Sequence, residues 1–221
     1  MSQIRTIARR ITPIRHALHG ARALHDSLIE RAWNVDTLSL PAADVNRDDE
    51  HDDGLCYEPM RYSILQPFLR PLQLTARDVV FDVGAGLGRA LHACARLGVQ
   101  RCVGVEIVPS FVSRARKNAE ALRGRRCPID IQLADASAAD YRGGTVYMFF
   151  NPFGVDTMRA VLDRIHDTLH DDPRPVQIAY FTPRYESALT ECPWLELTER
   201  KQSPFHRIAA SYWRSTEKAA A

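Results

Sequence analysis

Four polar side chains stand at the ends of four successive apolar segments of this sequence. Asp82 ends DVVFD, Glu106 ends RCVGVE, Asp135 ends IDIQLAD and Asn151 ends TVYMFFN. A carboxylate in such a position can accept hydrogen bonds from ribose hydroxyls or an adenine amino group, or can attract a cationic amino group. Each residue alone could be a helix cap, so it is the repetition at four segment ends that favours a ligand site.

The glycines after Asp82 are a second chemical signal. The sequence FDVGAGLGR places Gly84, Gly86 and Gly88 in G-x-G-x-G spacing. Glycine permits tight turns and close backbone approach to a ligand, where a Cβ would clash. The dinucleotide fingerprint has a small residue where this chain has Arg89, so the pattern favours an adenosine ligand other than NAD.

The fourth segment, VYMFFNPFG, stops on Asn151 and Pro152, with Phe153 directly after them. Proline fixes φ and lacks an N–H, so the chain can turn there with its carbonyl free. We expect the Asn151 side-chain oxygen and the Pro152 carbonyl to be able to accept hydrogen bonds from a ligand. The Phe153 ring would line the ligand site and could favour a cation. No dedicated base is evident, and the histidines, including His92, are expected at the surface.

These residues must be positioned by alternating strands and helices. Apolar patterning predicts strands at 78–84, 101–107, 129–135, 145–151 and 176–182, and helices at 88–98, 109–124 and 155–171. Two closing strands, 194–200 and 207–214, follow one another too closely for a crossover helix and should pair antiparallel. The pattern predicts an open, mostly parallel sheet with helices on both faces, which binds ligands beyond the carboxyl ends of its strands.

The segments VVFDVGAGLGRA, VGVEIVPSF, LADAS and YMFFNPF, in this order and spacing, resemble the class I S-adenosylmethionine-dependent methyltransferases. The resemblance covers roughly residues 57–213. It implies an α/β fold with a Rossmann-like, doubly wound, seven-stranded sheet whose last strand is antiparallel, in three α/β/α layers. It also implies S-adenosyl-L-methionine as cofactor and S-adenosyl-L-homocysteine as product. The cofactor-binding residues that it implies are Tyr57, Arg61, Asp82, Gly84, Ala85, Gly86, Gly88, Glu106, Ile107, Asp135, Ala136 and Asn151.

The resemblance gives individual roles to several of these residues. Asp82 resembles the acid near the amino-acid portion of the cofactor, Glu106 the ribose acid, and Asp135 the adenine-contacting acid. The segment YEPMRYS is similar to the approach segment of histone-lysine methyltransferases with this fold and of related small bacterial enzymes. Tyr57 and Arg61 would then lie over the cofactor. The alternative is that the tyrosines of this segment pack a leading helix onto the sheet.

The NPF segment resembles the N-P-P-Y motif of amino-group methyltransferases, with Phe153 at the second proline and Gly154 at the aromatic. The resemblance therefore favours in-line methyl transfer to nitrogen, on a protein lysine or a small-molecule amine. The catalytic residues would be Asn151, Pro152 and Phe153. The alternatives are a small-molecule O-methyltransferase, a cofactor-binding or partner module without catalysis and, less favoured, an NAD-dependent oxidoreductase.

Composition limits the classes of partner. The formal net charge of +2 over 221 residues gives no strong case for nucleic acid. No apolar run approaches the roughly 20 residues of a membrane helix, and no secretory signal is visible. The five cysteines include no C-x-x-C pair, so we predict neither a metal site nor a disulfide framework, and a cytoplasmic location.

The sequence outside this alternation lies mainly at the N-terminus. Residues 1–33 carry isoleucine and leucine at helical spacing with arginines between them, which predicts a helix packed on, or flexibly attached to, the main domain. A transit peptide and a membrane-surface or partner-binding helix are the alternatives. We expect this helix and an acidic loop at 1–56, a methyltransferase domain at 57–216 and a flexible tail at 217–221. The methyl acceptor and the oligomeric state stay open.

Overall fold

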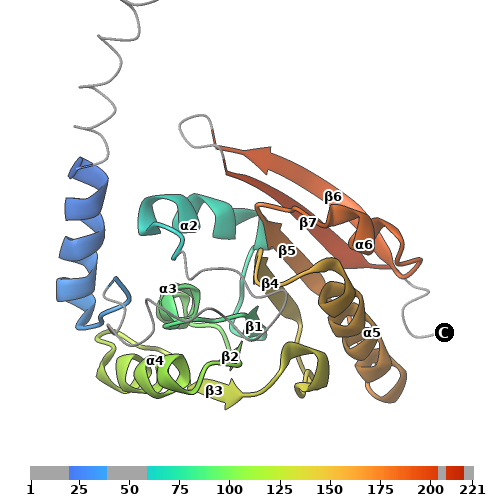
Figure 1. Ribbon diagram of the computed structural model, residues 1–221, viewed down its shortest axis with the longest axis horizontal. Coiled ribbons are helices and arrows are strands. Elements are labelled where there is room, and N and C mark those ends of the chain that lie inside the picture. Colours follow the sequence, from blue (N-terminus) through green and yellow to red (C-terminus); the bar gives the residue numbers. More distant parts are fainter. Residues whose placement is uncertain (1–19, 39–58, 204–207, 217–221) are drawn as a thin grey trace, which may run out of the picture.

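A computed structural model describes residues 20–38, 59–203 and 208–216 of the chain. Seven strands form one sheet in the order β3-β2-β1-β4-β5-β7-β6 (Figure 1). The strands are β1 Val79–Val83, β2 Arg101–Glu106, β3 Ile129–Leu133, β4 Val146–Phe150, β5 Gln177–Phe181, β6 Leu195–Gln202 and β7 Ala209–Ser215. The predicted seven-stranded fold is confirmed.

Neighbouring strands of the sheet run parallel to one another, except where they pair with the last strand. β1 pairs in parallel with both β2 and β4, whereas β7 pairs antiparallel with both β5 and β6. The two closing strands do pair antiparallel, as predicted from their close succession. The last strand lies between β5 and β6, so β6 forms the edge of the sheet.

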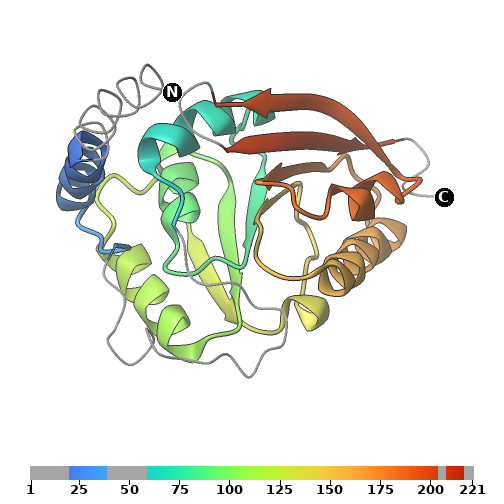
Figure 2. The same ribbon diagram turned by 45° about the horizontal axis from the view of Figure 1, so that its top comes forward.

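The helices cover the two faces of the sheet (Figure 2), and successive residues of the central strands pack into the cores on opposite faces. On β1, Val80 packs into the core beneath α2, α3 and α4, while Phe81 and Val83 pack into the core beneath α5 and α6. The bounds are α2 Tyr62–Leu69, α3 Arg89–Leu97, α4 Pro109–Ala121, α5 Val155–Asp171 and α6 Glu186–Thr190. Two short 3-10 helices, η1 Arg70–Leu72 and η2 Ala136–Ala138, follow α2 and β3.

Leu97, the last residue of α3, is 57% exposed, because it lies off the stripe that buries Leu91, Cys94 and Ala95. Helix α2 agrees with the alternative that the YEPMRYS segment leads into a packed helix, since Tyr62 is fully buried. Tyr57 lies outside the described residues.

The N-terminal helix, described from residue 20 to residue 33, packs beside α3 and α4 (Figures 1 and 2). Asp26 and Glu30 are its buried polar residues, and both face the main part of the molecule. Within the described residues, no helix is long and apolar enough to cross a membrane.

Candidate cofactor and acceptor site

The four polar residues singled out in the sequence follow four strands that are neighbours in the sheet. Because β3, β2, β1 and β4 are adjacent and parallel, their carboxyl ends meet at one edge. Asp82 lies within the end of β1 and Glu106 closes β2, while Asn151 directly follows β4 and Asp135 lies two residues after the end of β3. The structure therefore brings Asp82, Glu106, Asp135 and Asn151 to a common edge, where parallel sheets place their ligands.

The glycine loop lies at the switch point of the sheet, between β1 and β4. Gly84, Gly86 and Gly88 all have positive φ, a conformation that favours glycine. A Cβ on Gly84 would clash with the ring of Pro152. The need for glycine here thus comes from close contact between two strand ends, in addition to the ligand approach that the sequence predicts.

Glu106 ties the glycine loop to the start of α4. Its Oε2 accepts from the Gly86 N–H at 2.8 Å, and its Oε1 accepts from the Ile107 and Val108 N–H groups at 2.9 Å each. Burial raises the pKa of Glu106, and these backbone N–H groups oppose that shift. The carboxylate is held rigidly at the strand end, and its remaining lone pairs can accept from a diol such as ribose.

Asp82 is buried without a compensating donor. It is 7% exposed, and no described residue donates a hydrogen bond to its carboxylate. Burial, and then the neighbouring charge of Glu106, raise the pKa of Asp82 to about 7. An electrostatic environment of this kind is completed by a cation, as the resemblance implies for an amino-acid portion.

The β3 end combines an exposed acid with exposed apolar surface. Asp135 caps η2, because its Oδ1 accepts from the Ser137 N–H at 2.8 Å and from its hydroxyl at 2.7 Å. The side chains of Ile107 and Leu133, which end or follow the adjacent strands, are 36% and 52% exposed, and Ala136 is half-buried. An apolar surface beside a carboxylate can take a flat heterocycle that carries an amino group.

Asn151 carries two unfavourable features at once. Its φ of 45° lies in the left-handed region, and its buried Oδ1 has no hydrogen-bond partner among the described residues. A buried polar atom without a partner costs about 1–3 kcal/mol. Such strain collects at functional sites, and here it leaves an acceptor oxygen ready for a donor at the end of β4.

One predicted site residue, Phe153, is placed differently, and another, Arg61, has a partner in the N-terminal helix. Phe153 is 7% exposed and packs edge-to-face on Phe149, with ring centroids 6.3 Å apart, in the core beneath α5. The ring lies in the core rather than at the wall of an acceptor site, because burial of an aromatic ring between sheet and helix is strongly favourable. Arg61 caps the start of α2, and its Nη1 lies 3.6 Å from Asp26 Oδ2.

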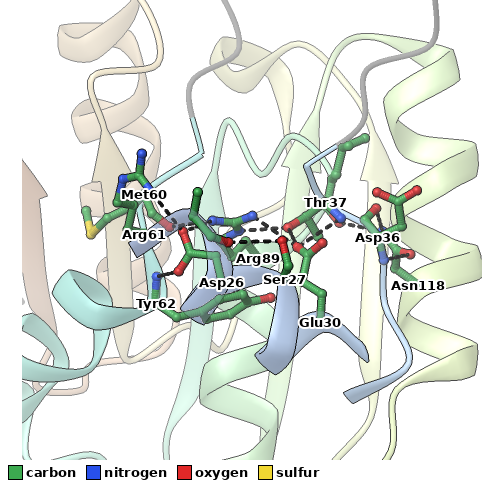
Figure 3. Close-up of polar contacts among 12 residues, drawn as sticks. Asp26, Ser27, Glu30, Asp36, Thr37, Met60, Arg61, Tyr62, Arg89 and Asn118 are labelled. Atoms are coloured by element: carbon green, nitrogen blue, oxygen red, sulfur yellow. Dashed lines mark hydrogen bonds and ion pairs between the residues drawn. The ribbon is translucent and has the colours of Figure 1, made fainter. Parts of the chain in front are cut away.

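Sequence patterns missed a buried network around Arg89 (Figure 3). The Arg89 guanidinium, with its residue 4% exposed, donates to Thr37 Oγ1 at 2.7 Å, Glu30 Oε1 at 3.0 Å and the Met60 carbonyl at 3.2 Å. Asp26 Oδ2 lies 3.6 Å from Nη1. The available signal was an arginine in the first turn of a helix, where the helix dipole disfavours a cation unless an acid is near.

His92 corrects another expectation. It was expected at the surface, but it is fully buried on α3 near Gly88, and neither ring nitrogen has a partner among the described residues. Burial, and then the charge of Arg89, lower the pKa of His92 to about 3. The ring is therefore neutral at physiological pH and contributes packing between α3 and α4.

Comparisons with known proteins agree with this geometry. Residues 80–172 match a family model described as a methyltransferase domain. A ribosomal protein L11 methyltransferase of Geobacter metallireducens is 32% identical over 116 residues, which are 52% of this chain and 37% of that protein. The chain thus spans little more than a third of this curated relative.

Solved structures share the fold at low sequence identity. An RNA methyltransferase from Salinibacter ruber, in complex with S-adenosyl-L-homocysteine, superposes with a TM-score of 0.54 at 22% identity, over 72% of this chain and 95% of that one. TrmN from Thermus thermophilus gives 0.60 at 16% identity, over 71% and 49% respectively. Residues 80–172 therefore match the methyltransferase-domain model, and the chain shares its fold with these solved structures.

Proposed function

We propose that this protein uses S-adenosyl-L-methionine to methylate a nitrogen nucleophile, on a protein lysine or a small-molecule amine. The observation that carries the proposal is Asn151, with its left-handed backbone and its buried, unpartnered Oδ1 at the end of β4. An acceptor without a donor at this position matches the N–H of an incoming amine. A hydroxyl acceptor could also donate one hydrogen bond, so O-methylation is the nearest alternative.

The residues at the strand ends fit the proposed cofactor. Asp82 would face its ammonium group, because the carboxylate is buried and has no donor among the described residues. Glu106 would accept from the ribose hydroxyls, while Asp135 and the apolar Ile107 and Leu133 would hold the adenine. The backbone of the glycine loop would line the space between them.

The bound cofactor would supply an electrophilic methyl group, and the protein supplies position and electrostatics. Asn151 Oδ1 and the Pro152 carbonyl would each accept a hydrogen bond from the acceptor amine and aim its lone pair. Orientation of this kind contributes up to about 7–11 kcal/mol to lowering a bimolecular barrier. Close contact between Pro152 and Gly84 fixes the turn that carries the Pro152 carbonyl against the glycine loop. The methyl acceptor and the cofactor would therefore be held in a fixed position relative to one another.

The acceptor is proposed from charge and from related proteins. The Geobacter relative is named for a ribosomal protein, and the Salinibacter structure for RNA. The net charge of +2 gives this chain little of the phosphate attraction that RNA binding requires. A protein or small-molecule amine is therefore the better supported acceptor.

Calorimetric titration tests the cofactor first. S-adenosyl-L-homocysteine should bind the wild-type protein stoichiometrically, and NAD should not; the reverse result would support an oxidoreductase and contradict the proposal. Incubation with methyl-labelled cofactor and cell extract, then separation of protein, nucleic acid and small molecules, identifies the acceptor class. Label in nucleic acid alone would exclude the proposed acceptor, and tight cofactor binding without any label would support a non-catalytic module.

A further inference from the structure

The N-terminal segment, residues 20–38, reaches the glycine loop through Arg89. This arginine is the first residue of α3, and it directly follows Gly88, which caps the helix in a left-handed conformation. Its guanidinium is held by Glu30, Thr37 and Asp26, all from the N-terminal segment. Fixing this side chain therefore fixes the first turn of α3 and the end of the glycine loop relative to the N-terminal helix.

A second connection reaches the same loop independently of Arg89. Asn118 on α4 donates from Nδ2 to the Leu87 carbonyl at 3.2 Å and to the Asp36 carbonyl at 2.8 Å. Its Oδ1 accepts from the Asp36 N–H at 3.0 Å (Figure 3). One buried amide thus clamps residue 36 of the N-terminal segment onto residue 87 of the glycine loop.

The N-terminal helix also holds the chain that enters α2. Asp26 Oδ1 accepts from the Tyr62 N–H at 3.1 Å, and its Oδ2 lies 3.6 Å from Arg61 Nη1. Arg89 additionally holds the Met60 carbonyl. The resemblance places this segment over the cofactor, so the N-terminal helix contacts the chain on two sides of the candidate site.

On the basis of the proposed cofactor, we infer that residues 20–38 are a built-in part of the cofactor site and that Arg89 and Asn118 are positioning residues for the glycine loop. Neither residue needs to touch the cofactor. They act by holding residues 84–88 in the binding conformation before the ligand arrives, which lowers the ordering cost of binding.

A matched control separates positioning from general stability. Arg174 is also a largely buried arginine, 10% exposed at its side chain, that donates to the Gly144 carbonyl at 2.8 Å and to the Thr168 carbonyl at 3.0 Å. Gly144 precedes the amino end of β4, at the opposite edge of the sheet from the glycine loop. Arg174→Lys should lower stability as Arg89→Lys does, because lysine keeps the charge but lacks the planar fork of donors.

The experiment measures S-adenosyl-L-homocysteine affinity by calorimetry well below the Tm of each full-length variant. Arg89→Lys and Asn118→Leu should each weaken binding by about tenfold or more, since small misplacements at a preorganised site have large effects. Arg174→Lys should bind within about twofold of wild type, whatever its Tm, because it lies remote from the site. Arg89→Lys that is folded and binds like wild type, or an equal loss in Arg174→Lys, would overturn the inference.

Amide hydrogen exchange of the ligand-free proteins gives a readout that does not depend on the cofactor. Residues 84–88 should exchange faster in Arg89→Lys and Asn118→Leu, and at the wild-type rate in Arg174→Lys. If the wild-type protein does not bind S-adenosyl-L-homocysteine, the proposed function fails. The exchange data alone then decide whether Arg89 and Asn118 position the glycine loop, and unchanged exchange of residues 84–88 in both variants would refute that role.

Discussion

The carboxyl edge of the sheet and the junction between the N-terminal helix and α3 both bury polar groups, but they treat them in opposite ways. At the edge, Asp82 and the Oδ1 of Asn151 have no hydrogen-bond partner among the described residues. At the junction, the guanidinium of Arg89 has three acceptors and a nearby carboxylate. The two regions meet at the glycine loop.

The contrast separates ligand-binding groups from groups that hold the fold. A buried polar group without a partner lowers stability, so it is expected where a ligand supplies the missing partner. A buried group whose hydrogen-bond partners all belong to the protein is held in one geometry, and it makes the structure around it more rigid. Changes at the junction should therefore affect stability first, and changes at the edge should affect turnover or ligand affinity first.

Breaking the junction should give the largest effect on stability. Arg89→Met leaves the carboxylate of Glu30 buried without its cation and that of Asp26 with Arg61 as its remaining arginine partner, so the free energy of unfolding should fall by about 3–5 kcal/mol. The control is Arg159→Met, which breaks an ion pair with Glu191 whose side chains are 47% and 55% exposed, and should leave the free energy of unfolding close to that of wild type. Urea unfolding measures both; equal losses would erase the distinction between the regions.

Removing the unpartnered oxygen at the edge should affect turnover while sparing stability. Asn151→Gly relieves the left-handed backbone and deletes Oδ1, so methyl transfer should fall by about 10²–10³-fold, as for other single positioning hydrogen bonds. S-adenosyl-L-homocysteine affinity and Tm should stay near wild type. Gln73, another left-handed residue on the surface, provides the control: Gln73→Gly should retain turnover. Retained turnover in Asn151→Gly would remove this residue from the mechanism.

The charge of Asp82 should make cofactor affinity depend on pH. With a pKa of about 7 in the free protein, the carboxyl is protonated in acid and must lose its proton to face an ammonium group. S-adenosyl-L-homocysteine affinity should therefore weaken below pH 7, approaching about tenfold per pH unit. Asp82→Asn should bind weakly at every pH, without this slope.

The stability of the ligand-free protein tests the same residue, and its dependence on pH should have the opposite sign to that of the cofactor affinity. The pKa of Asp82 is raised on folding, so its ionisation destabilises the folded state progressively as pH rises from about 4 through about 7. Asp82→Asn should then be more stable than wild type above pH 7. A wild-type affinity that does not change between pH 6 and 8 would show that Asp82 does not face a cation.

His92 should give the smallest effect at neutral pH. It has no partner for either ring nitrogen, so His92→Leu should change the free energy of unfolding by no more than about 1 kcal/mol at pH 7. The pKa of His92 is lowered to about 3 on folding, so wild type loses stability as pH falls below about 6.5, by about 1.4 kcal/mol per unit. His92→Leu should be the more stable protein at pH 5 in thermal unfolding, and lower stability there would contradict the neutral, unpaired ring.

Much of the edge of the sheet was predictable because its signals are local. Apolar runs of five to six residues, the glycine spacing after Asp82 and the position of Asn151 depend on neighbours within a few residues. Parallel strands joined by crossover helices then bring Glu106 and Asp135 to the same edge, whereas the order of the strands is known from the structure. The direction of the Phe153 ring was not predictable, because a one-residue turn decides whether it faces the core or the site.

Local sequence patterns were enough to predict the mostly parallel sheet, the glycine loop and the set of polar residues at four strand ends. How the loop is held depends on long-range packing, because the hydrogen-bond acceptors of Arg89 lie 29 to 59 residues away along the chain. Helical periodicity reports which face of a segment is buried and cannot report which distant charge meets it. In the sequence, Asp26 and Glu30 are indistinguishable from ordinary acidic residues of an exposed helix. Tertiary packing removes them from water and places them around the buried guanidinium of Arg89.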